Sequence, residues 1–85
     1  MDYIENIGNP ENYKSYPILF DDVKAFYRYI DTYEKDRSTP NMLFLESILH
    51  DLLLSIKHRV VEGFISPALA EEMKEYFRGV FNDKL

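Results

Sequence analysis

The chain has 85 residues, 46% of them hydrophobic, and a net charge of −5 from 10 basic and 15 acidic side chains. This length allows a single domain, because domains typically run to about 100–150 residues. The aromatic content of 15% is too high for a disordered chain, and the absence of Cys excludes disulfides and Cys-ligated metal sites. The negative charge disfavours a basic nucleic-acid-binding domain.

No targeting signal is visible in the sequence. The N-terminal residues begin with an acid and lack the basic and apolar regions of a secretory signal. The longest apolar stretch, residues 42–56, is too short and too polar to span a bilayer, which needs about 20 apolar residues. We therefore expect a cytoplasmic protein that does not associate with membranes. Ile, Asn, Lys, Tyr and Phe total 31 residues against 14 for Gly, Ala, Pro and Arg, which suggests a low-GC genome, bacterial or of a mobile element.

Residues 1–18 are predicted to form a mostly irregular arm. Gly8, Pro10, Pro17 and several Asn residues favour turns over a helix. The arm also carries too many apolar side chains for a free tail, so we expect it to lie against the body of the protein. These side chains are Tyr3, Ile4, Ile7, Tyr13, Tyr16 and Ile18.

A first helix is predicted over residues 21–35. Asp21 and Asp22 suit the positive N-terminal end of a helix, where a carboxylate also accepts hydrogen bonds from free backbone N–H groups. Tyr29 falls outside the apolar stripe of this helix and should be substantially exposed. The stripe consists of Val23, Phe26, Tyr27, Ile30 and Tyr33.

Two further helices are predicted over residues 40–62 and 67–81. Each start combines a capping hydroxyl with a Pro in the first turn: Thr39 or Ser38 with Pro40, and Ser66 with Pro67. Gly63 is expected to end the second helix in the left-handed conformation. No five-residue segment alternates between apolar and polar side chains, so strands are not indicated. The sequence predicts an all-α fold, a small three-helix bundle with an ordered arm, forming one helical domain over residues 1–85.

The helix over residues 40–62 is apolar nearly all round. Beside one wide apolar arc it carries a second line formed by Leu43, Leu54 and Val61, while Phe44 points to another side. Such a helix is buried or covers more than one surface. Two interpretations follow: the arm covers the second line, or the line stays open as a contact surface for a partner or a second copy.

Residues for catalysis or cofactor binding are sparse. Glu46 and His50 share a helix face at i, i+4, but there is no HExxH pattern and no third metal ligand. There is no Cys and no G-x-S-x-G nucleophile motif, and Ser47 lies one turn from His50 as often happens by chance. The three glycines are isolated, so no phosphate-binding loop is present. We expect no enzymatic activity, no metal and no cofactor.

Charged residues offer only weak support for a link to DNA. The basic residues are scattered over the three helices, as Lys24, Arg28, Lys57, Arg59, Lys74 and Arg78. An acidic surface that mimics DNA has slight support in Asp21, Asp22, Asp31, Glu34 and Asp36. Direct binding and mimicry are both minor hypotheses, because net negative charge repels phosphate and neighbouring cations dilute the acidic field.

The leading hypothesis is a non-enzymatic protein-binding module: a small acidic helical regulator, inhibitor or adaptor that docks on another protein. Seven Tyr in 85 residues support it, since Tyr is enriched at interfaces, although Tyr also replaces Phe and Leu at the edges of cores. The alternative is a self-associating, homodimeric accessory protein. The predicted partner-binding residues are Leu43, Leu54, Val61, Tyr29, Tyr33, Tyr13 and Tyr16.

Overall fold

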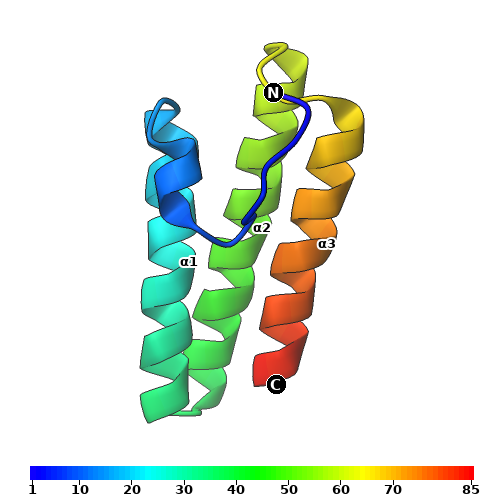
Figure 1. The fold of residues 1–85 in the computed structure, drawn as a ribbon. Coiled ribbons are helices and arrows are strands. Elements are labelled where there is room, and N and C mark those ends of the chain that lie inside the picture. Colours follow the sequence, from blue (N-terminus) through cyan, green and yellow to red (C-terminus); the bar gives the residue numbers. More distant parts are fainter.

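The computed structural model describes all 85 residues as an N-terminal arm followed by three long helices. The arm includes a short 3-10 helix, η1 (Pro10–Tyr13), and leads into α1 (Pro17–Lys35), α2 (Thr39–Val61) and α3 (Pro67–Lys84) (Figure 1). No residue is in a strand. The predicted all-α fold, a small three-helix bundle, is confirmed.

The starts of α2 and α3 follow the predicted capping pattern. The backbone N–H of Asn41 donates to Ser38 Oγ at 3.3 Å, and that of Leu69 donates to Ser66 Oγ at 3.2 Å. Each bond satisfies a donor that the first turn of a helix otherwise leaves free. Gly63 has φ +82°, a left-handed conformation open to Gly because it lacks a Cβ.

The predicted start of the first helix at residue 21 is wrong, because α1 begins at Pro17. Pro17 occupies the first turn, where its fixed φ favours the helix and its missing N–H costs nothing, as with the prolines of α2 and α3. Asp21 and Asp22 therefore lie beyond the first turn and do not cap the helix. At the other end of the chain, α3 continues three residues past the predicted residue 81.

α2 packs against both α1 and α3, while α1 and α3 meet through side chains, as in the ion pair between Glu34 and Lys84. The arm passes across α2 in the space between the two outer helices (Figure 1). Its first residue is tied to the α2–α3 turn: the Met1 amino group donates to the Phe64 carbonyl at 2.9 Å, and the Ser66 N–H donates to the Met1 carbonyl at 2.9 Å. The arm therefore covers one face of α2 and leaves the opposite face uncovered.

One hydrophobic core joins the arm to all three helices. From the arm, Ile4 and Tyr13 are buried, and the Tyr13 hydroxyl donates to the Ile7 carbonyl. At the centre, the rings of Phe26 and Phe77 meet edge to face with centroids 5.7 Å apart. The other fully buried large side chains are Leu19, Val23, Leu45, Leu52, Ile56, Ile65, Leu69 and Met73.

Gly8 marks the closest approach of the arm to the helices. A Cβ at this position would overlap the Tyr76 hydroxyl and stand 2.8 Å from that of Tyr27. Gly79, within α3, has open space around it. The arm therefore needs the absence of a side chain at residue 8, whereas α3 has no such need at residue 79.

Gly8→Ala is expected to lower the free energy of unfolding by about 1–3 kcal/mol, the usual cost of overpacking. Gly79→Ala, the matched control, is expected to raise it by about 0.5–1 kcal/mol, because Ala suits a helix interior better than Gly. Urea denaturation measures both changes. Equal effects of the two substitutions would contradict the tight seating of the arm.

Leu52→Ala is expected to lower the free energy of unfolding by about 2–5 kcal/mol, because Leu52 is fully buried and its removal leaves a cavity. Leu43→Ala on the same helix should change it by no more than about 0.5 kcal/mol, since Leu43 is 56% exposed. Chemical denaturation of the two variants beside the parent chain checks this assignment of core and surface. A large loss at Leu43 would place it in the core.

Candidate protein-interaction surface

The second apolar line of α2 lies on the face that the arm leaves uncovered. Leu43, Leu54 and Val61 are 56%, 43% and 79% exposed. They share one side of the helix because spacings of 11 and 7 residues return close to the same direction, and the line runs about 27 Å along the axis. We call this side, with Ser47 and His50 between the apolar residues, the outer face of α2. The interpretation in which the arm covers the line is wrong.

The arm lies on the other side of α2, over the seam where α1 and α3 meet. These two helices touch there through side chains such as Phe26 and Phe77, but their backbones approach at few points, so the seam takes a further cover. Ile4 and Tyr13 provide it and become buried, with Ile7 and Tyr16 packed against the same core. Of the predicted apolar residues of the arm, Ile18 is instead part of α1 and is 64% exposed.

Two predicted partner-binding tyrosines are not at the surface. Tyr13 is fully buried, and burial together with the nearby Tyr76 raises the pKa of its phenol. Tyr33 is also buried, and the Arg37 guanidinium lies 5.6 Å from the centre of its ring. Both assignments are wrong, because these rings belong to the apolar core of the bundle.

The other two tyrosines are half-buried at the two ends of the molecule. Tyr16 packs on Phe64, with ring centroids 5.3 Å apart. Tyr29 stacks on Phe44 at 6.4 Å, so it is less exposed than the sequence predicted. Phe44 itself is 59% exposed, although it is not among the predicted partner-binding residues. This ring extends the outer face of α2 toward α1.

A shallow acidic depression lies where α1 meets the outer face of α2. It has a volume of about 260 Å³ and is lined by Ile18, Asp22, Asp51, Leu54, Ser55 and His58. Burial raises the pKa of the Asp22 carboxyl above its ordinary value, and the charges of Asp51 and Asp21 add to this effect. The neighbouring Ser55 hydroxyl and the charge of Arg59 act in the opposite direction, but burial outweighs them. The ionised Asp22 carboxylate is thus held beside apolar side chains at some cost in stability.

A basic depression lies on the other side of Leu54, where α2 meets α3. It measures about 210 Å³ and is lined by His50, Leu53, Leu54, Lys57, Lys74 and Arg78. The fold thus brings together three cations that look scattered in the sequence. Arg59 does not join them, because its guanidinium pairs with Glu62, and Lys24 lies over the Phe20 ring at 4.9 Å.

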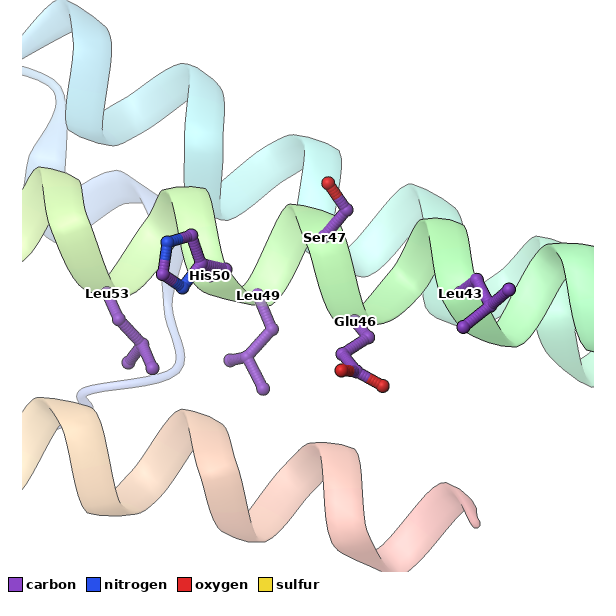
Figure 2. A pocket seen from close by; sticks show the side chains of 6 residues that line it. All are labelled: Leu43, Glu46, Ser47, Leu49, His50 and Leu53. Carbon is purple, nitrogen blue, oxygen red and sulfur yellow. The ribbon is translucent and has the colours of Figure 1, made fainter.

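A leucine-lined groove lies nearer the N-terminal end of α2. It measures about 420 Å³ and is lined by Leu43, Glu46, Ser47, Leu49, His50 and Leu53. In Figure 2, Glu46, Leu49 and Leu53 are directed toward α3. Glu46 and His50, the pair at metal-ligand spacing, therefore share one groove, but no third His, Asp or Glu completes a metal-binding group with them.

The sequence matches no known family model, no curated protein and no solved structure. No helix of the chain is long and apolar enough to cross a membrane. The surface itself is therefore the guide to function. It consists of a line of exposed apolar side chains about 27 Å long, with depressions of opposite charge on its two sides.

Asp22→Asn is expected to raise the stability of the fold at pH 7. The folded-state pKa of Asp22 is raised, so its ionised form opposes folding, and this penalty grows as the pH rises through that pKa. Below about pH 3 the carboxyl is protonated in both states, and the variant should then match the parent chain. Thermal melts at pH 7 and pH 3 measure the difference. A variant that is less stable than the parent at pH 7 would contradict the assigned shift.

Proposed function

We propose that this protein is a non-enzymatic protein-binding module, a small acidic helical regulator, inhibitor or adaptor, which acts by docking the outer face of α2 on another polypeptide. The observation that carries the proposal is the exposure of Leu43, Leu54 and Val61 on one side of a helix whose opposite side is fully covered. A row of exposed apolar side chains along one side of a helix supports an interaction site there, although polar side chains separate its members.

The dimensions of the surface favour a polypeptide over a small ligand. The apolar line extends over about 27 Å, several times the length of a small metabolite. The depressions beside it are shallow and open, whereas small-molecule sites are concave and enclose most of the ligand. A helix or sheet edge laid along α2 contacts all three apolar side chains at once.

The distribution of charge favours protein over nucleic acid as the partner. The cations of the basic depression and the carboxylates Asp22 and Asp51 lie on the two sides of Leu54, so a phosphate backbone along α2 would meet carboxylates as well as cations. Phosphate binding depends on the number of charges neutralised, and this arrangement offers few. A protein surface with charges of both signs fits better.

The alternative function is that of a self-associating, homodimeric accessory protein. It is favoured by the presence of both signs of charge on one face, because a surface of this kind is complementary to a copy of itself. The two functions share the docking face and differ in the identity of the occupant.

Leu54→Asp is expected to reduce capture of a partner polypeptide by at least tenfold, because it places a charge at the centre of the apolar line. Tyr3→Asp is the matched control, since Tyr3 is an exposed apolar residue of the arm, 75% exposed and outside every depression described above. The tagged variants are used as bait in lysate of the source organism, and circular dichroism verifies that both fold. Equal capture by the two variants would overturn the proposal.

A further inference from the structure

The two charged depressions lie side by side at one level of the molecule. Leu54 lines both of them, and the other α2 residues of each are within four positions of it: Asp51, Ser55 and His58 on the α1 side, His50, Leu53 and Lys57 on the α3 side. Ile18, at the start of α1, lines the acidic depression, and no residue before it lines either one, so both belong to the outer face of α2. Negative charge thus lies on the α1 side of α2, and positive charge lies on the α3 side.

Most of these charges have no partner within the chain. Asp22 and Asp51 form no salt bridge, and neither do Lys57 and Arg78. Only Lys74 is paired, with Glu71 at 3.5 Å. The depressions are therefore open to oppositely charged groups from outside, and an occupant complementary to both carries cations over the α1 side and anions over the α3 side.

We propose that the occupant is a second copy of this chain, docked face to face with its α2 parallel to the first, so that a two-fold axis runs along the helices. Rotation about such an axis exchanges the α1 side with the α3 side and leaves the level along α2 unchanged. The acidic depression of each copy then faces the basic depression of the other. This inference rests on the docking face of the proposed function and takes its alternative form, the self-associating protein, because it makes a second copy the occupant of that face.

The antiparallel arrangement does not produce this match. A two-fold axis perpendicular to α2 within the interface places α1 over α1 and α3 over α3, so that carboxylates face carboxylates and cations face cations. Like charges brought together in this way oppose association. In the parallel arrangement Leu43, Leu54 and Val61 each meet their own counterpart, so the apolar line of each copy is covered along its whole length.

The size of the molecule sets an upper limit on a dimer interface. Its long side projects to about 800 Å², from extents of 38 and 21 Å, and the outer face of α2 is part of that side. Each partner in a standard-sized protein interface buries about this area. Exposed ion pairs contribute little affinity, so the apolar line supplies most of the attraction and the charges select the parallel orientation.

The first experiment reverses the charge of one depression at a time and measures the mass of each variant by analytical ultracentrifugation. The parent chain is expected to dimerise at micromolar concentration. Asp22→Lys with Asp51→Lys makes both depressions basic, and Lys57→Glu with Arg78→Glu makes both acidic, so each variant should dimerise at least tenfold more weakly. An equimolar mixture of the two variants should form a heterodimer. Circular dichroism verifies that the variants remain folded.

The second experiment determines orientation with a single introduced thiol, which the absence of Cys makes unambiguous. Ser47→Cys is expected to cross-link rapidly to its own counterpart under mild oxidation, because the parallel axis brings the two positions together. Glu72→Cys is the control, since Glu72 is exposed on α3 and lines none of the depressions. Cross-linking no faster than the control would overturn the parallel dimer.

The outcomes separate this inference from the proposed function. A parent chain that stays monomeric up to about 100 µM, or charge variants that dimerise as well as the parent, overturns the second copy as occupant. The proposed function survives that result if a different protein is captured by the parent chain and lost with Leu54→Asp. The proposed function fails as well if Leu54→Asp does not reduce the capture of any protein.

Discussion

The structure depends on how the arm packs over the seam between α1 and α3. The two helices meet there through the rings of Phe26 and Phe77, but their backbones approach each other at few points. Ile4 and Tyr13 cover this seam, and the tie between Met1 and the α2–α3 turn holds the arm along its path. Burial of these side chains adds the arm to the core that all three helices share.

Because the arm packs on the inner side of α2, the outer face of α2 stays exposed. The hydrophobic positions of α2 extend nearly all round the helix, more than two neighbouring helices cover. Once the arm is committed to the inner side, no segment of the chain is left for Leu43, Leu54 and Val61. The exposure of these residues follows from the arrangement of the fold, and their apolar character is the reason why this face is proposed as the docking surface.

The sequence predicted the ends of helices well where a capping Ser, a Pro or a Gly determines the local backbone conformation. Ser66 with Pro67 fixes the start of α3, and Gly63 fixes the end of α2. The predicted start of α1 is wrong because Asp21 and Asp22 resemble a helix start. Pro17, four residues earlier, carries the stronger signal. Surface assignments were less predictable: Tyr33 follows the helical period into the core, whereas the burial of Tyr13 depends on how the arm folds back, which no local pattern specifies. The gathering of Lys57 with Lys74 and Arg78 likewise depends on helix packing.

The composition of the outer face balances binding against solubility. Ser47 and His50 separate Leu43 from Leu54, and Lys57 and His58 separate Leu54 from Val61, so the apolar side chains do not merge into one patch of the kind that causes aggregation. The net charge of −5 opposes the approach of a second copy in every orientation, so only a local match of acid with base offsets it. The proposed occupant meets the apolar line in one register and provides this match on its two sides. Asp22, which lines the acidic depression without a salt-bridge partner of its own, is one of the carboxylates to which that occupant brings a cation.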